Sequence, residues 1–262
     1  VFIVKKNILL FIALGLILSA CQHQIEQNEK SNKVDSQKRK EEAAALNTQL
    51  GMGYLKQGDR ARAKRKLLYA LELAPKSASA NAAMAYFMEQ SGDNSKADGY
   101  YQKALSYSGN SGAQLNNYGT YLCRQGKYQE AEQYFLKAVK DTNYLNTSGA
   151  YENAGLCAQA IPDYAKAKMY FKKALEQDPE RKQSLYELIA IAKKEQDTKG
   201  MLDYFEHHPT LVYNDPSLLR EAMEFARKEQ KDQLVDFYQK RLLTLNQFAT
   251  NKFGAKDDHN NG

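Results

Sequence analysis

A pattern of small and large residues recurs along this chain of 262 residues, usually at an interval of 34 residues. Each copy has a small residue, an alanine twelve positions later, a large residue four positions after that and a second alanine three further on. The small residues that open the four copies are Gly51, Ala85, Gly119 and Gly155, the last offset by 36. A repeat of this length predicts helix pairs that bury their apolar faces only by stacking on one another.

This spacing is the tetratricopeptide pattern, in which each unit is two antiparallel helices. The first copy reads Leu50-Gly51 and then Tyr54, with Asn47 where the pattern has Trp, and Pro75 follows its second helix. The small residues let helix backbones approach closely, and glycines such as Gly58 mark the turns between helices. We therefore predict an all-α fold, a tetratricopeptide repeat superhelix of about six helix pairs.

The repeat domain is expected over residues 42–248. Its last two units fit the pattern less well, as terminal repeats do because one of their faces meets water. In the fifth, we expect His208-Pro209 to end the second helix. The expected units lie near 44–77, 78–111, 112–145, 148–181, 182–214 and 215–248.

The flanks of this domain are polar. Residues 21–41 contain no aromatic residue and are predicted to be a flexible tether, because such a stretch buries too little surface to offset its ordering entropy. Its run Lys38-Arg39-Lys40 is interpreted as solvated charge, with contact to anionic head groups as the alternative. Residues 249–262 are expected to form a disordered tail.

The first twenty residues predict an export signal. Lys5 and Lys6 precede an uncharged apolar run from Ile8 to Leu18, which is shorter than the roughly 20 residues of a membrane-spanning helix. The run ends in Leu18-Ser19-Ala20-Cys21, which resembles the bacterial lipobox. The resemblance implies a signal peptide over residues 1–20 and lipid attachment at Cys21, the alternative being a plain signal peptide with a chance cysteine.

The lipobox resemblance also implies a location. In lipoproteins of this kind, an Asp after the lipidated cysteine favours retention in the inner membrane, and this chain has Gln22 there. We therefore expect a lipid-anchored protein on the periplasmic face of the outer membrane of a Gram-negative cell. Several acyl chains on one residue would anchor it firmly, since a single chain binds a membrane only marginally.

Charge and motif content argue against an enzyme and against a nucleic-acid-binding protein. The net charge is only +6, whereas nucleic acid binding calls for a concentrated basic face. The sequence has no phosphate-binding loop, nucleophile elbow or zinc-protease motif. His207 and His208 are neighbours at a predicted helix end, where a partly positive group suits the helix dipole. We expect no catalytic residues, metal, other cofactor or small-molecule substrate.

Two cysteines remain after Cys21. Cys123 and Cys157 fall in the predicted first helices of the third and fourth units, which are neighbours in this architecture. From their positions alone, a disulfide and a pair of buried thiols are both open.

A closer resemblance rests on two segments. The run from Asn116 to Cys123 reads NNYGTYLC and the run from Asn153 to Ala158 reads NAGLCA. They resemble the NNYG-x-FLC and NAGLC segments of the PilF/PilW lipoproteins of type IV pilus biogenesis, with Tyr121 in place of Phe. The similarity spans roughly residues 42–248. Because both cysteines recur as a pair in that family, the resemblance implies a Cys123–Cys157 disulfide.

The resemblance implies an outer-membrane pilotin, a helper that binds the type IV pilus secretin and promotes its localisation, multimerisation or stability. Stacked pairs form a groove lined by first helices, which suits an extended or helical peptide. Those positions can instead pack on neighbouring repeats. The residues expected to line the partner-binding groove are Met52, Leu55, Lys56, Tyr86, Glu89 and Gln90.

Two other functions stay open at this point. One is a general tetratricopeptide adaptor in outer-membrane or cell-wall assembly, and the other is a lipoprotein activator of a periplasmic synthase.

Overall fold

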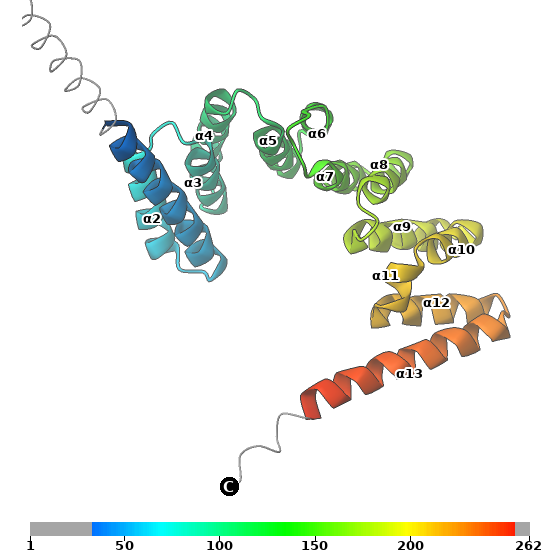
Figure 1. The fold of residues 1–262 in the computed structure, drawn as a ribbon. Coiled ribbons are helices and arrows are strands. Elements are labelled where there is room, and N and C mark those ends of the chain that lie inside the picture. The colour runs from blue at the N-terminus through cyan, green and yellow to red at the C-terminus, as the bar shows by residue number, and fades with distance from the viewer. Residues whose placement is uncertain (1–32, 255–262) are drawn as a thin grey trace, which may run out of the picture. The chain divides into compact units, whose positions relative to one another are not determined.

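The computed structural model describes residues 33–254, and the regular structure of that range is helical (Figure 1). It consists of two compact units, residues 33–110 and 111–254. The predicted signal peptide, Cys21 and Gln22 lie outside the described residues.

The first unit holds two helix pairs. Its first helix runs over residues 33–56 and lies beside α2 (Arg60–Leu73), and α3 (Ala78–Gln90) lies beside α4 (Asn94–Tyr107). The pairs meet at an apolar cluster formed by Ala63 and Leu67 of α2 and by residues of α3.

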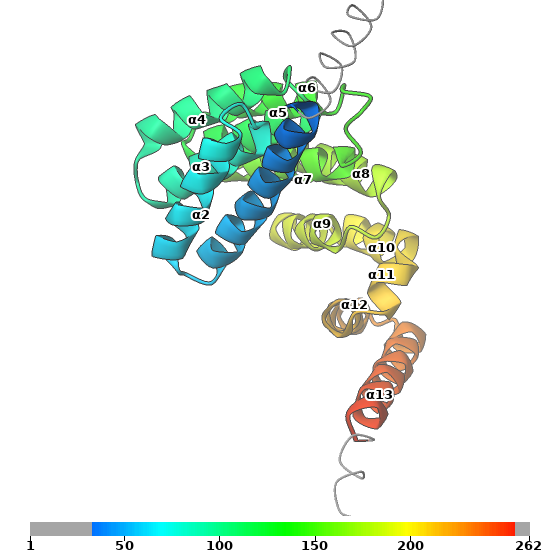
Figure 2. The ribbon, with the colours of Figure 1, turned by 60° about the vertical axis from the view of Figure 1, so that its left-hand side comes forward.

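In the second unit, Figures 1 and 2 show each second helix beside the first helix of its own pair. Its core continues from one pair to the next, through large buried side chains such as Phe171, Leu188 and Phe205. The all-α tetratricopeptide fold is therefore confirmed. The helices of this unit are α5 (Gly112–Arg124), α6 (Tyr128–Ala138), α7 (Thr147–Ala160), α8 (Tyr164–Gln177), α9 (Lys182–Glu195), α10 (Thr198–His207), α11 (Pro209–Tyr213), α12 (Pro216–Lys228) and α13 (Asp232–Gly254).

Aspartates start many of the second helices. The side chains of Asp59, Asp93 and Asp163 each accept a hydrogen bond from the backbone N–H three residues further on, which satisfies a donor that the first turn leaves unpaired. In the third helix pair, Lys127 occupies this position, and its side chain makes no capping hydrogen bond.

The turns inside the pairs need a left-handed residue. Gly58, Gly92 and Gly126 adopt φ of 81°, 80° and 77° there, which glycine does at little cost. In the fifth and sixth pairs the equivalent residues are Gln196 and Gln230, with φ of 57° and 55°.

The small residues of the repeat lie where helices come closest. A Cβ atom added to Gly155 would lie 2.6 Å from the Phe171 ring, and one added to Gly119 would lie 2.9 Å from the Phe135 ring. Both distances are far inside van der Waals contact, so the positions require glycine or a large local shift.

The borders of the domain differ from the prediction at both ends. Residues 33–41, expected in the tether, belong to the first helix, and residues 249–254, expected in the disordered tail, belong to α13. The prediction treated low hydrophobicity as a sign of disorder. A helix that starts from a packed segment extends at little cost, and side-chain contacts such as Arg39–Asp35 (3.3 Å) support it.

The fifth helix pair also differs from the expectation. Pro209 ends α10, as predicted, but it also opens the short helix α11, where it occupies the first turn. Proline suits that position because the first-turn N–H groups have no partner within a helix.

Candidate functional site

A hollow of about 590 Å³ opens on the first unit between the helix over 33–56, the start of α2 and α3. Five of the six residues predicted for the groove line it, so residues 34 positions apart along the chain meet on one surface. The lining residues are Met52, Gly53, Leu55, Lys56, Gly58, Arg60, Tyr86 and Gln90.

The floor of the hollow is apolar. Met52 and Leu55 are half-buried and pack against the cluster that includes Leu67, Met84 and Phe87. The sequence left two interpretations of these positions open, lining of a groove and packing on a neighbouring repeat. Both apply, because each side chain packs on the neighbouring repeat and still lines the hollow. Tyr86, also half-buried, lies on α3 and completes the apolar lining.

Glu89, the sixth predicted residue, does not line the hollow. Its carboxylate accepts a hydrogen bond from the Tyr101 hydroxyl at 3.4 Å, which connects α3 to α4. This carboxylate serves the packing of its own helix pair, and its role in binding a partner stays a prediction.

Arg60 lines the hollow and was missed from the sequence. Its guanidinium donates to the backbone oxygen of Gln90 and to the Ser91 hydroxyl (2.9 Å), and it lies 6.0 Å from the centre of the Phe87 ring. A cation placed there also complements the carbonyl end of α3. The repeat pattern assigns Arg60 only to the start of a second helix, and the reach of its side chain brings it to the next pair.

The lining has positive charge and no carboxylate. Lys56 and Arg60 are its charged residues, and it contains no His, Cys, Asp or Glu. Such a surface can bind apolar side chains and attract acidic ones, but it offers no nucleophile with an adjacent base.

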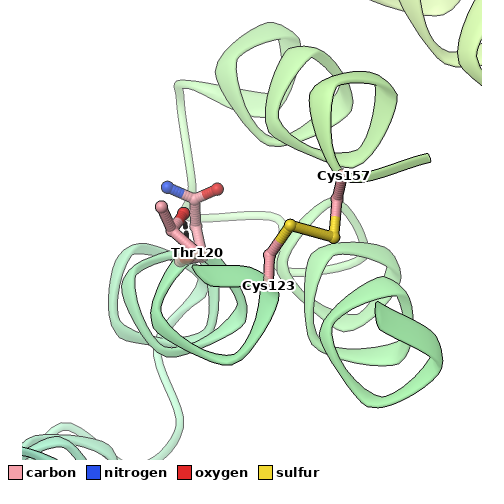
Figure 3. The surroundings of a disulfide bond; sticks show 4 residues. Thr120, Cys123 and Cys157 are labelled. Atoms are coloured by element: carbon pink, nitrogen blue, oxygen red, sulfur yellow. Dashed lines mark hydrogen bonds between the residues drawn. A yellow bond between two sulfur atoms is a disulfide. The ribbon is translucent and has the colours of Figure 1, made fainter. Parts of the chain in front are cut away.

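The second unit contains the cysteine bridge. Cys123 of α5 and Cys157 of α7 form a disulfide, with their Cα atoms 5.8 Å apart, a separation common in protein disulfides (Figure 3). The bridge joins the first helices of the third and fourth pairs, whose predicted neighbourhood allows it.

An amide contact joins the same two helices. The Asn153 side chain donates to the Asn116 side-chain oxygen at 3.0 Å, and Thr120, which Figure 3 shows near the bridge, donates to the Asn116 backbone oxygen at 2.8 Å. Sequence reasoning treated these asparagines only as marks of a family. Their separation of 37 residues, close to one repeat, was the available signal for a contact.

Glu132 forms a third connection, between α6 and α8. It accepts hydrogen bonds from the Tyr170 hydroxyl (2.5 Å) and the Lys166 ammonium (2.9 Å). Burial raises the pKa of Glu132, but these two donors outweigh it and hold the pKa below its ordinary value. Burial together with the Glu132 carboxylate raises the pKa of Tyr170 well above its ordinary value. These shifts accompany a packed ion pair and its hydrogen-bonded tyrosine.

Residues 33–254 contain neither a membrane-spanning helix nor a metal-binding cluster. Over that range no helix combines the length and apolar character needed to cross a bilayer. In the same range no three His, Cys, Asp or Glu side chains gather as a metal site would require.

Comparison with known proteins places the chain among tetratricopeptide repeat proteins. The tetratricopeptide repeat family model matches residues 111–180. The type IV pilus assembly protein PilF of Pseudomonas aeruginosa is 34% identical over 203 residues, which is 78% of each chain. An uncharacterised protein of Haemophilus influenzae is 33% identical over 116 residues, covering 44% of this chain and 65% of that protein.

Two solved structures agree with this placement. The structure of P. aeruginosa PilF has a TM-score of 0.62 at 30% identity and covers 81% of this chain and 99% of its own. The structure of PilW, a type IV pilus biogenesis factor, has a TM-score of 0.59 at 26% identity and covers 77% of this chain and 92% of its own.

Proposed function

This chain belongs to the PilF family of tetratricopeptide proteins of type IV pilus biogenesis, and from that premise we propose that it is a pilotin. In this proposal it is an outer-membrane lipoprotein that binds the type IV pilus secretin and promotes its localisation, multimerisation or stability. The observation that carries the proposal is the hollow of the first unit, where Met52, Leu55 and Tyr86 form an open apolar lining.

The hollow suits a peptide segment better than a small molecule. It is an open surface between two first helices, and its apolar lining has Lys56 and Arg60 beside it. The apolar face of a helix or an extended strand fits such a surface. Carboxylates flanking that face on the secretin would pair with the two cations and orient the segment.

The anchor is the second part of the proposal. Acylation of Cys21 holds the protein to the outer membrane on its periplasmic side, and Gln22 favours that membrane over the inner one. The apolar run before Cys21 and the lipobox-like Leu18-Ser19-Ala20-Cys21 support it. Cys21→Ala is expected to abolish acyl labelling and co-fractionation with the outer membrane, and an unchanged acyl label would contradict the assignment.

The role is one of binding, without catalysis. The hollow lacks the paired nucleophile and base of covalent catalysis, and the clustered ionisable groups of the second unit are packed ion pairs such as Glu132–Lys166.

The binding test is a double variant, Leu55→Glu/Tyr86→Glu. Buried interface anchors commonly cost more than about 1 kcal/mol each on truncation. We therefore expect recovery of the secretin from detergent-solubilised envelopes to fall at least about tenfold. The matched control is Leu46→Glu/Tyr107→Glu, the same substitutions at exposed positions of the same unit, which should bind as the unmodified protein does.

Two further measurements keep the test decisive. Helix content and melting temperature of the double variant separate a binding defect from unfolding, because Leu55 also packs on the core. Lys56→Glu, at an exposed residue, reverses a charge beside the hollow without disturbing that core and should also weaken binding. A folded double variant that still supports secretin assembly would overturn the proposal, as would recovery of a cell-wall synthase in place of the secretin.

A further inference from the structure

The second helix of the first unit carries a concentration of positive charge. Helix α2 has five basic residues and one acidic residue, Glu72, among its 14 residues. Its buried stripe consists of Ala63, Leu67 and Ala70, so most of the charge lies away from the core.

Three of these cations form no hydrogen bond, ion pair or ring contact with the described residues, and the Asp59 carboxylate attracts one of them, Arg65, only at longer range. Arg60 is bonded at the end of α3, and Arg62 pairs with Asp59 and stacks on Tyr54 at 4.7 Å. Over residues 33–254, no hydrogen bond, ion pair or ring contact involves the side chain of Lys64, Arg65 or Lys66; Lys64 and Arg65 are exposed and Lys66 is half-buried.

Helix α8 shows that a basic second helix does not in itself leave charge unpaired. It has four lysines against one acidic residue, Glu176, and each lysine has a partner. Two form ion pairs and two lie over tyrosine rings. The contacts are Lys166–Glu132 (2.9 Å), Lys168–Glu195 (2.5 Å), Lys172–Tyr204 (5.5 Å) and Lys173–Tyr151 (5.5 Å).

Apolar side chains extend the same face of α2. Leu68 and Tyr69 are 47% and 48% exposed, and each lies one helical turn after a member of the cationic run. Cations beside an exposed leucine and tyrosine form the combination that binds the head-group region of a bilayer. We call these five residues, Lys64, Arg65, Lys66, Leu68 and Tyr69, the basic face of α2.

We infer that the basic face of α2 rests on an anionic phospholipid surface. The face lies opposite the buried stripe of its helix and is no pocket, so it suits a plane of phosphate groups. Lysine and arginine near such a surface are attracted by its negative potential, and the leucine and tyrosine can enter the boundary between head groups and acyl chains.

The position of this face along the chain favours a membrane over an acidic protein. The inference rests on the anchoring part of the proposed function, in which Cys21 holds the lipid. Eleven residues lie between Cys21 and residue 33, where the first helix is described, and at about 3.5 Å per residue the connecting chain reaches at most ~40 Å. The anchor therefore keeps the first unit within a short distance of the bilayer, where a weak contact with lipid gains from high local concentration.

Vesicle binding by residues 22–262, which contain every described helix and lack the lipidated cysteine, tests the inference. We expect binding to vesicles of 3:1 phosphatidylcholine and phosphatidylglycerol, little binding to phosphatidylcholine alone, and loss of binding as salt rises. Lys64→Gln/Arg65→Gln/Lys66→Gln should lower the partition coefficient at least about tenfold, since each cation near an anionic surface contributes a several-fold gain.

The matched control lies on α8. Lys168→Gln/Lys172→Gln/Lys173→Gln removes the same charge from lysines that already have partners, and it should change binding less than about twofold. Equal losses in the two triple variants would overturn the inference, because net charge alone would then explain binding. Absence of binding by the unmodified chain, or binding to polyglutamate in place of vesicles, would also overturn it. Because no secretin is present, this result is independent of the test of the hollow.

Discussion

The two units of this protein are built from the same kind of helix pair, yet different polar contacts join the pairs within each unit. In residues 111–254, polar side chains about one repeat apart connect successive pairs. In residues 33–110, the ion pairs are local, such as Asp93–Lys96, and Arg60 provides a polar contact from one pair to the next. The connections of the second unit include Asn116–Asn153, Glu132–Lys166, Glu152–Arg181, Lys182–Asp215 and Lys193–Glu221.

This difference lies outside the positions that define the repeat. The small and large residues of the pattern pack the helix pairs of both units, whereas the residues between them decide what the surface does. In the second unit they cross-link neighbouring pairs. In the first unit they leave an apolar hollow and an unpaired basic helix face, the two surfaces to which we assign partners.

The largest expected difference concerns the disulfide. Removing it with Cys123→Ala/Cys157→Ala should lower the free energy of unfolding of the second unit by about 3–4 kcal/mol, the chain-entropy value for a loop of this length. Hydrogen exchange followed helix by helix should show α5 to α8 losing protection while α2 and α3 keep theirs. Two free thiols in the denatured, unreduced protein would contradict the predicted bridge.

Glycine substitutions compare the packing of the two units. At Gly155 a new Cβ would meet the Phe171 ring at 2.6 Å, and we expect Gly155→Ala to destabilise by about 1–3 kcal/mol through overpacking. At Gly51 the nearest atoms, 2.7 Å away, are Cγ and Cδ2 of the buried Leu67, an aliphatic side chain that adapts more readily than a rigid ring. Gly51→Ala should cost less, because alanine favours the helix at both positions but the aliphatic neighbour of Gly51 can adapt more than the Phe171 ring. Urea titration measures the loss of unfolding free energy in both variants. A larger loss for Gly51→Ala than for Gly155→Ala would refute the prediction.

Asp215 tests the polar connections by pH. It accepts hydrogen bonds from Tyr186 (2.8 Å) and Lys182 (3.1 Å) on α9 while capping α12. Burial raises the pKa of this carboxyl, but the bonds from Tyr186 and Lys182 outweigh it and leave the pKa below its ordinary value. A carboxyl with a lowered folded pKa stabilises the fold above its unfolded pKa near 3.9, and this stability is lost as pH falls through the folded value.

Asp215→Asn should therefore destabilise the second unit by about 1 kcal/mol at pH 7 and flatten its loss of stability below pH 4. Asn can still cap the helix, so the variant isolates the charge. The control is Asp93→Asn in the first unit, whose carboxyl is more exposed, and its effect should be smaller. An Asp215→Asn protein with an unchanged acid transition would show that the ionised group contributes nothing.

The smallest expected effect concerns the turns. Gln230 holds a left-handed conformation that Gly58 holds in the first unit. Gln230→Gly should stabilise by about 0.5 kcal/mol, because relief of the left-handed strain exceeds the added entropy of the unfolded chain. Gly58→Gln should destabilise by a similar amount. Thermal melting shows whether each variant gains or loses stability. A loss in Gln230→Gly would mean that the glutamine side chain stabilises the fold by more than its left-handed backbone costs.

Most of the site could be predicted from the repeat register. The spacing of 34 residues places Met52 and Tyr86 on neighbouring first helices, and the structure brings them to one hollow. Arg60 could not be found this way, because its role depends on how far its side chain reaches. Glu89 was expected in the same lining and lies outside it, because the register gives the direction of a side chain and says nothing about a partner such as Tyr101.

Whole-chain composition concealed the basic face of α2. A net charge of +6 is mild over 262 residues, and both the four lysines of α8 and the five cations of α2 contribute to it. The contacts of each side chain distinguish the two helices, since ion pairs and ring contacts engage the lysines of α8 and leave Lys64, Arg65 and Lys66 unpaired.

The sequence by itself determined the helix pairs, their turns and the close approaches at Gly119 and Gly155. These features depend on contacts within one repeat or between adjacent repeats, where a fixed spacing sets the geometry. Only the tertiary structure decided which polar residues meet across repeats, that residues 33–41 continue the first helix, and where charge stays unpaired. Such outcomes depend on side-chain reach and on competition among several nearby partners, which spacing along the chain does not specify.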